Sequence, residues 1–307
     1  MNTKDLNHDG SIKKIIMDLW IALRPLSLSL AVASTTLGIL MAKREGYLFS
    51  ENTYLDIVKI ILVTIAGMSV LGAANLINDF YEGSFKYHRP VEKTYRFLKY
   101  ERTAFDLLVF ALSISCLLLT AAIGLILMYF STYKLIFIGA VGIIGAYAYT
   151  GEPFVYKKRG LGAVLSLILV GSLMVEGSYM VFSDEFSWGP IIYTLPAALT
   201  IPLMMMSNEL RDYERDKKLG IKTLTVLMGR NTGRAIYITL ILLMYILTAV
   251  FAAVGKLPWL SLLVLLTIPT AISCYKKASL PQKSAIKITN ILHIGFNLLM
   301  IISLILR

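Results

Sequence analysis

Long apolar segments dominate this chain of 307 residues and leave it few ways to fold. Hydrophobic residues make up 57% of the sequence and charged residues only 16%, below the roughly 25% of a typical soluble domain. The apolar segments are close to the roughly 20 residues that an α-helix needs to cross a bilayer. A fold in water would leave too much of this apolar surface exposed. The sequence therefore predicts an all-α, polytopic membrane protein with one domain over residues 1–307.

We expect nine membrane-spanning helices, separated by short polar turns or by turns that contain glycine and proline. Their expected ranges are 19–42, 54–82, 103–130, 133–150, 161–182, 188–210, 232–255, 258–275 and 285–306. Residues 1–18 are polar and lack the charged and then apolar pattern of a cleaved signal peptide. We expect them to form a polar cytoplasmic segment before the first span.

The distribution of Lys and Arg predicts how the helices are oriented. The N-terminal segment and the loops after the second, fourth, sixth and eighth spans hold 23 of the 30 basic residues, and the opposite side holds 5. Such an excess marks the cytoplasmic side, so we expect the N-terminus inside and the C-terminus outside. This distribution accounts for the net charge of +11, and no nucleic-acid partner is expected. Two cysteines in apolar stretches and three scattered histidines give no disulfide framework or zinc site.

Acidic and amide side chains form two clusters near the ends of the second and sixth spans. The clusters are Asn75, Asn78, Asp79 and Glu82, and Asn208, Asp212 and Asp216. Within each cluster the spacings of three, four and seven residues place the side chains on one helix face. Acidic residues are costly in membrane segments and commonly functional there. Both spans run inward in the predicted orientation, so both clusters are expected at the cytoplasmic side.

The residue types of these clusters indicate a magnesium and diphosphate site. Carboxylate and amide oxygens suit Mg²⁺, which completes its coordination with phosphate oxygens. Basic residues lie near the clusters in sequence or on the same side of the membrane: Lys86, Arg89, Lys157, Lys158, Arg159, Arg211, Lys217 and Lys218. Acidic and basic groups around one cavity are what a metal-chelated diphosphate requires. Because the surrounding helices are apolar, the sequence predicts a polyprenyl diphosphate as the substrate.

Each of these features also has a structural interpretation. Charges at span ends can mark the water boundary, and Glu176 within the fifth span is either a buried structural group or a substrate contact. Arg24 faces either phosphate or lipid headgroups, and Lys59 is expected to be structural. Tyr147 and Tyr149 are either interfacial aromatics or a face that stabilises a cation. A transporter is the alternative class, although its sites tend to lie near the bilayer midplane. A non-catalytic scaffold would not need the Mg²⁺-type spacing.

Over nearly its whole length the sequence resembles the UbiA superfamily of membrane prenyltransferases. Residues 20–25 resemble the opening Arg-Pro segment of that family, and residues 75–82 resemble its first Asp-rich motif. Residues 208–216 resemble the second motif, and residues 217–224 followed by Gly229 are also similar to the family pattern. The resemblance implies a bundle of nine helices whose active-site cavity opens at the cytoplasmic side.

Within the superfamily the chain is most similar to the 1,4-dihydroxy-2-naphthoate branch, through residues 149–153, 158–162 and 208–212. This similarity implies Mg²⁺-dependent transfer of a polyprenyl group to 1,4-dihydroxy-2-naphthoate in menaquinone biosynthesis, with release of diphosphate. The alternative acceptors are 4-hydroxybenzoate, homogentisate, haem and a lipid glycerol phosphate. We expect a bacterial plasma membrane as the location.

The resemblance also implies roles for particular residues. The expected catalytic residues are Asn78, Asp79, Glu82, Asn208, Asp212 and Asp216, of which Asp79, Glu82, Asp212 and Asp216 bind metal. The expected substrate-binding residues are Arg24, Asn75, Lys86, Arg89, Tyr149, Lys158 and Arg211. The first motif departs from the family pattern, because Glu82 stands where an Asp is usual and a further acidic residue is missing near Lys86 and His88. The first half of the metal site is therefore expected to differ from that of its relatives.

Overall fold

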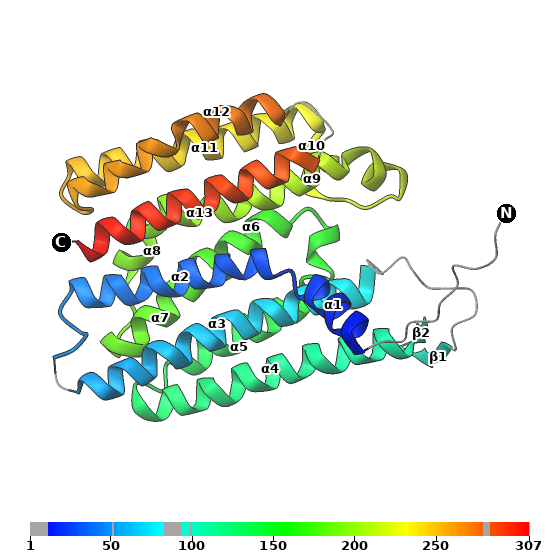
Figure 1. Cartoon of the computed structure of the whole chain (residues 1–307), viewed down its shortest axis with the longest axis horizontal. Helices are drawn as coiled ribbons and strands as arrows, with labels where there is room; N and C mark the ends of the chain where they lie inside the picture. The colour runs from blue at the N-terminus through cyan, green and yellow to red at the C-terminus, as the bar shows by residue number, and fades with distance from the viewer. Residues whose placement is uncertain (1–11, 51, 83–93, 99, 279–282, 307) are drawn as a thin grey trace.

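A computed structural model describes residues 12–50, 52–82, 94–98, 100–278 and 283–306 of the chain. Long helices run roughly side by side and form one elongated bundle (Figure 1). The first helices are α1 (Ile12–Leu23), α2 (Pro25–Arg44), α3 (Thr53–Glu82), α4 (Ala104–Phe130) and α5 (Leu135–Ala148). Next come η1 (Tyr156–Lys158), α6 (Gly162–Ser166), η2 (Leu167–Leu173), α7 (Met174–Ser183), α8 (Trp188–Ala198) and α9 (Thr200–Lys218). The last are α10 (Leu224–Met228), α11 (Arg230–Ala253), η3 (Trp259–Thr267), α12 (Ile268–Lys277) and α13 (Lys283–Ile305).

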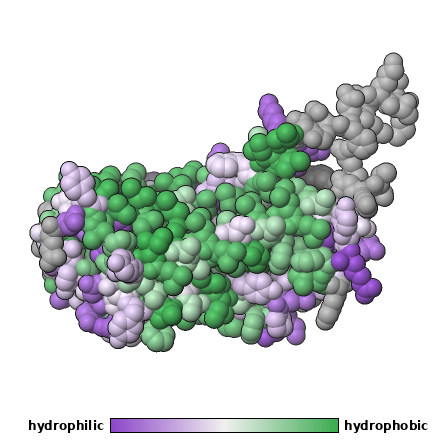
Figure 2. Space-filling model, turned by 90° about the horizontal axis from the view of Figure 1, so that it is seen from below, coloured by the Kyte–Doolittle hydropathy of each residue, from purple (hydrophilic) through white to green (hydrophobic). Residues whose placement is uncertain are grey.

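Eight helical segments in the described part of the chain are long and apolar enough to cross a membrane. Three of them join consecutive elements: Gly162–Ser183, Trp188–Lys218 and Trp259–Lys277. Hydrophobic side chains cover most of the middle of the face shown in Figure 2, and hydrophilic ones gather toward its ends. The prediction of an all-α, multi-pass membrane protein is therefore confirmed.

The predicted fourth span differs from expectation, because α5 is only 14 residues long. At 1.5 Å per residue it covers about 21 Å, less than the roughly 30 Å of a bilayer core. The predicted range 133–150 included residues at both ends that form turns instead of helix. The described residues therefore hold eight segments of spanning length and one shorter apolar helix, α5, where nine full spans were predicted.

The first predicted span, 19–42, also differs, because a break at Arg24 divides it into α1 and α2. Arg24 has a φ of 52°, in the left-handed region, and Pro25 begins α2. A proline disfavours helical backbone at the residue before it and is well suited to the first position of a helix. The apolar run therefore continues across the break, while the helix axis does not, and α1 lies across the ends of its neighbours (Figure 1).

An unpredicted β-hairpin lies beyond the end of α3. Strands β1 (Thr94–Phe97) and β2 (Tyr100–Thr103) are antiparallel, with Thr94 opposite Thr103 and Arg96 opposite Glu101. The hairpin, α1 and α10 lie at one end of the bundle, and α13 finishes at the other (Figure 1). Because α3 and α9 both finish at the end that carries the hairpin, the two polar clusters lie at the same end of the molecule.

Candidate active site

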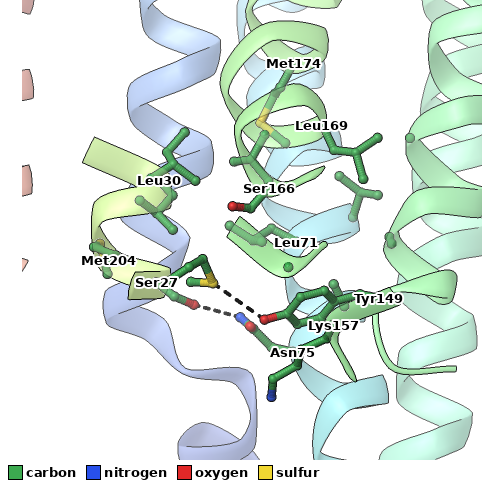
Figure 3. Close-up of a pocket in the computed structure, with 18 of the residues that line it drawn as sticks. Ser27, Leu30, Leu71, Asn75, Tyr149, Lys157, Ser166, Leu169, Met174 and Met204 are labelled. Atoms are coloured by element: carbon green, nitrogen blue, oxygen red, sulfur yellow. Dashed lines mark hydrogen bonds between the residues drawn. The ribbon is translucent and has the colours of Figure 1, made fainter. Parts of the chain in front are cut away.

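A cavity of about 810 Å³ opens at this end of the bundle, between α2, α3, α5, α7 and α9. Figure 3 shows Asn75, Tyr149 and Lys157 near one end of the cavity, and Leu169 and Met174 further along it. Its polar part is lined by Arg24, Asn75, Glu82, Lys157, Lys158, Asn208, Glu209, Arg211, Asp212, Arg215 and Asp216. Its apolar part is lined by Leu30, Val63, Leu71, Leu127, Leu135, Ile138, Ile143, Leu169, Val170, Leu173, Met174 and Val181. A charged mouth therefore continues into an apolar channel between the helices.

The second predicted cluster lies entirely on the wall of this cavity. Asn208, Asp212 and Asp216 follow one another at intervals of one helical turn along α9 and all three line the cavity. Arg211 contacts Asp212 through two nitrogens, with Nε 2.7 Å from Oδ1. Arg215 bridges the two aspartates, with Nη2 3.1 Å from Asp212 Oδ2 and 2.8 Å from Asp216 Oδ1. The predicted ladder of carboxylates is thus compensated by arginines of the same helix.

The first predicted cluster is divided between the cavity wall and the layer behind it. Glu82 lines the cavity and accepts a hydrogen bond from Lys157 Nζ at 2.7 Å. Asn75 also lines it and donates to the Ser27 hydroxyl at 2.7 Å. Asn78 and Asp79, by contrast, are buried side chains and are not part of the lining. The four residues share one face of α3, as their spacing predicts, but only the first and the last, Asn75 and Glu82, line the cavity.

Arg24 connects the buried half of this cluster to the cavity. Its Nη2 donates to Asn78 Oδ1 at 2.7 Å and lies 3.2 Å from Asp79 Oδ1, while the side chain also lines the cavity. The break between α1 and α2 places the guanidinium at this position. Arg24 therefore faces carboxylate and amide oxygens in the protein, in addition to the cavity.

The other predicted substrate-binding residues lie on the wall as well. Tyr149 and Lys158 come from the segment after α5, and Lys157 Nζ lies 5.6 Å from the centre of the Tyr149 ring. Burial raises the pKa of Tyr149 above its ordinary value, so the phenol stays protonated and acts as a hydrogen-bond donor. Its hydroxyl donates weakly to Met205 Sδ at 3.5 Å. Lys86 and Arg89 lie outside the described residues.

Three further residues of the wall were not among the predicted site residues. Lys157 belongs to a run of three basic residues that was expected near the clusters, but no local pattern separates its role from that of Lys158. Arg215 was predictable in principle, because it follows Asp212 by three residues on one helix. Glu209 accepts hydrogen bonds from Thr225 N at 2.9 Å and Thr225 Oγ1 at 3.0 Å, which tie α10 to α9. That contact crosses a loop and has no local sequence signal.

Comparison with known proteins identifies the family. A model described as the UbiA prenyltransferase family matches residues 31–296 of the chain. The chain belongs to this family. This UbiA prenyltransferase is 30% identical over 280 residues to UbiA prenyltransferase domain-containing protein 1 of Homo sapiens, a match that covers 86% of this chain and 78% of the human protein. The homolog from Drosophila melanogaster is 29% identical over 269 residues, which cover 84% and 70% of the two chains.

Solved structures share the fold of this UbiA prenyltransferase at low sequence identity. The apo structure of a UbiA homolog from Aeropyrum pernix K1 has a TM-score of 0.63 at 15% identity and covers 91% of this chain and 98% of that chain. The structure of a UbiA homolog from Archaeoglobus fulgidus bound to DMAPP and Mg²⁺ has a TM-score of 0.60 at 14% identity, with coverages of 94% and 99%. The predicted superfamily and its prenyltransferase activity are confirmed, whereas the naphthoate branch stays a prediction.

The donor set of the cavity fits a hard divalent cation. In the described part of the chain, no three His, Cys, Asp or Glu side chains come together as a ready-made metal group. The oxygen-bearing side chains are instead spread over two walls, with Asn208, Asp212 and Asp216 on α9 and Glu82 on α3. Mg²⁺ commonly uses one or two carboxylates and takes its other ligands from water and phosphate. The wall can therefore supply part of a Mg²⁺ coordination shell that a diphosphate completes.

Proposed function

We propose that this UbiA prenyltransferase transfers a polyprenyl group from polyprenyl diphosphate to 1,4-dihydroxy-2-naphthoate, with Mg²⁺ as the cofactor. The observation that carries the proposal is the continuity between a mouth of carboxylates and cations and an apolar channel. The mouth matches a metal-chelated diphosphate, and the channel matches an isoprenoid chain. The Mg²⁺ and DMAPP bound by the Archaeoglobus fulgidus homolog support the cofactor.

Five cations of the wall would receive the diphosphate: Arg24, Lys157, Lys158, Arg211 and Arg215. In the structure Lys157 pairs with Glu82, and Arg215 pairs with Asp212 and Asp216. When a metal-chelated diphosphate enters, these side chains can exchange carboxylate oxygens for phosphate oxygens. Asp212, Asp216 and Glu82, with the Asn208 amide, would then hold Mg²⁺, which stabilises the charge that develops on the leaving diphosphate.

The reaction breaks the bond between the first prenyl carbon and its oxygen, and the electron pair leaves with diphosphate. The apolar helices around the channel exclude water from the resulting allylic cation, and the ring of Tyr149 lies on the same wall. A carbon of the electron-rich acceptor ring then bonds to the cation. For 1,4-dihydroxy-2-naphthoate, the substitution is accompanied by loss of the ring carboxylate as CO₂.

Substitution of the second cluster tests the metal and diphosphate site. We expect Asp212→Ala and Asp216→Ala each to lower prenyl transfer at least 100-fold in membranes supplied with Mg²⁺ and prenyl diphosphate, because each removes a charge that acts on the leaving group. Glu214→Ala is the matched control on the same helix, because Glu214 is exposed and does not line the cavity. Near-normal transfer by both aspartate variants would refute the proposed site.

A panel of acceptors tests the choice of acceptor. Membranes containing the wild-type chain are incubated with a radiolabelled prenyl diphosphate and, in separate reactions, with 1,4-dihydroxy-2-naphthoate, 4-hydroxybenzoate and homogentisate. We expect product only, or far faster, with the dihydroxynaphthoate. A preference for another acceptor would refute the assignment to the naphthoate branch. It would not affect the proposed metal and diphosphate site.

We also propose that the end of the bundle that carries the cavity faces the cytoplasm. The excess of Lys and Arg on that side supports this orientation, and a cysteine-accessibility assay on intact cells would test it. The relatives reported above are animal proteins, so the bacterial membrane expected from the sequence stays a prediction.

A further inference from the structure

The C-terminal part of the chain carries positive charge without any acidic residue to compensate it. From Lys217 to Arg307 it holds 11 Lys and Arg residues and no Asp or Glu. Among the described cations of this region, Arg230 alone forms an ion pair, at 3.9 Å to Glu214 of α9. The other cations therefore take their counter-ions from outside the chain.

Arg234 is one of these cations and lies where the start of α11 meets the end of α12 (Figure 1). Its guanidinium carbon is 5.6 Å from the centre of the Tyr275 ring, a distance at which a cation is attracted to the face of an aromatic ring. Close by on α11, the Tyr237 hydroxyl is hydrogen-bonded to Thr289 Oγ1 of α13 at 2.8 Å. The arginine is thus held at a junction between packed helices.

Arg234 lacks a hydrogen-bond acceptor in spite of this fixed position. Its Nε is buried and has no partner among the described residues, and no described carboxylate forms an ion pair with it. Buried polar groups are nearly always hydrogen-bonded, and a guanidinium can only donate. The missing partner is therefore an oxygen acceptor. An anion with several oxygens, such as a phosphate, fits the fork of guanidinium donors well.

The start of α11 adds further donors at the same place. Gly229 occupies the N-cap position, so the N–H groups of the first turn receive no hydrogen bond from a capping side chain. The N-terminus of a helix attracts anions through these N–H groups and through the helix dipole. Side chains on a helix lean toward its N-terminus, so the Arg234 side chain and the first turn face the same region.

The surroundings of this junction favour the phosphate of a lipid over a free anion. The spans Arg230–Ala253 and Trp259–Lys277 are each mostly exposed on the outside of the bundle, as expected for helices that face lipid. Further along them, the side chains of Leu242, Ile268 and Ile272 are exposed and apolar. Arg234 and Tyr275 do not line the cavity, so the diphosphate of the reaction is not their ligand.

We propose that the junction of α11 and α12 binds one anionic phospholipid, with its phosphate on Arg234 and the first turn of α11 and its acyl chains along both helices. An acidic head group is favoured over a choline head group, because this part of the chain has no carboxylate to pair with choline. The bound lipid also steadies the wall of the active site. The reason is that α10, which ends next to α11, is tied to Glu209 and begins after Thr223 of the wall.

Titration of the purified full chain with lipid in a neutral detergent tests the proposal without catalysis. The probes are dioleoyl phosphatidylglycerol and dioleoyl phosphatidylcholine, which share their acyl chains and phosphate and differ in net charge. Native mass spectrometry measures the bound lipid, and the unfolding temperature reports the stabilisation. We expect wild type to prefer phosphatidylglycerol. We expect Arg234→Gln to bind it about tenfold more weakly, because charge-assisted hydrogen bonds to the phosphate are lost.

Arg96→Gln is the matched control, because Arg96 is an exposed arginine of the hairpin and lies outside α11 and α12. It removes the same charge and should leave the affinity for phosphatidylglycerol unchanged. Tyr275→Leu retains every charge and an apolar side chain, and should weaken binding about threefold through loss of the ring face. This second variant tests the site even if Arg234→Gln does not fold.

Equal affinities of Arg234→Gln and Arg96→Gln for phosphatidylglycerol would overturn the site, as would equal binding of the two lipids by wild type. Inorganic phosphate and glycerol 3-phosphate are the probes for a free anion. Neither should displace the lipid at an equal concentration, and displacement by either would identify a soluble phosphate as the ligand instead. The proposed function is tested separately, because absence of prenyl transfer by wild type would leave these binding results unchanged.

Discussion

Arg215 holds both aspartates of the second cluster, so it competes with any metal ion for their oxygens. We expect Arg215→Gln to tighten binding of a divalent cation in the absence of prenyl diphosphate. We expect the same substitution to raise the KM for prenyl diphosphate, because it removes one of the cations that receive the phosphate oxygens. Tighter cation binding together with a higher KM would show that Arg215 competes with the metal ion and binds the phosphate. A residue that only stabilises the helix would produce neither effect.

The geometry sets the size of the first effect. Arg215 Nη2 makes two contacts, at 3.1 Å to Asp212 and 2.8 Å to Asp216, and the Arg215 side chain is 53% exposed. Ion pairs with an exposed partner contribute about 0.2–1 kcal/mol each, so the two together contribute about 1 kcal/mol. A metal ion that no longer displaces the arginine should bind roughly fivefold more tightly, since 1.4 kcal/mol corresponds to a factor of ten.

The assay is titration of the purified chain with Mn²⁺, an ion that accepts the same oxygen ligands as Mg²⁺, followed by electron paramagnetic resonance of the free ion. Arg230→Gln is the control, because Arg230 pairs with Glu214 at 3.9 Å and does not line the cavity. Unchanged or weaker Mn²⁺ binding by Arg215→Gln would refute the competition between arginine and metal.

Two further predictions concern the tie between α9 and α10 and the apolar channel. Glu209→Ala should destabilise the protein by about 3 kcal/mol, because two hydrogen bonds from Thr225 to a buried carboxylate are lost. Thermal unfolding in detergent measures this loss of stability. Equal stability of Glu209→Ala and wild type would contradict the prediction. Gly142→Leu should lower activity with the longest prenyl diphosphates more than with the shortest, because Gly142 lines the channel and has open space where a side chain would begin. Product analysis across chain lengths checks this, with Val141→Leu, on the exposed face of α5, as the control. An unchanged chain-length profile would count against the channel as the isoprenoid site.

Much of the candidate site was predictable because its residues follow one another on single helices. The repeat from Asn208 to Asp212 to Asp216 fixes one face of α9 whatever surrounds the helix, and all three residues line the cavity. The same reasoning was less complete for α3. A helical face is wider than the strip of it that meets a cavity, so Asn78 and Asp79 turned out to lie behind the wall. Only the packing of α1, α2 and α4 around α3 decided which members of the stripe are accessible.

The sequence by itself determined the membrane class, the approximate limits of the spans, the two polar clusters and the superfamily. These follow from residue type and short-range spacing, which act within one segment of the chain. Only the tertiary structure decided that Lys157 pairs with Glu82, that the break at Arg24 brings its guanidinium to Asn78, and that Arg234 of α11 meets the ring of Tyr275 on α12. Each of these contacts joins segments that lie about 40 or more residues apart, and the energy that selects them comes from packing and burial that no local pattern records.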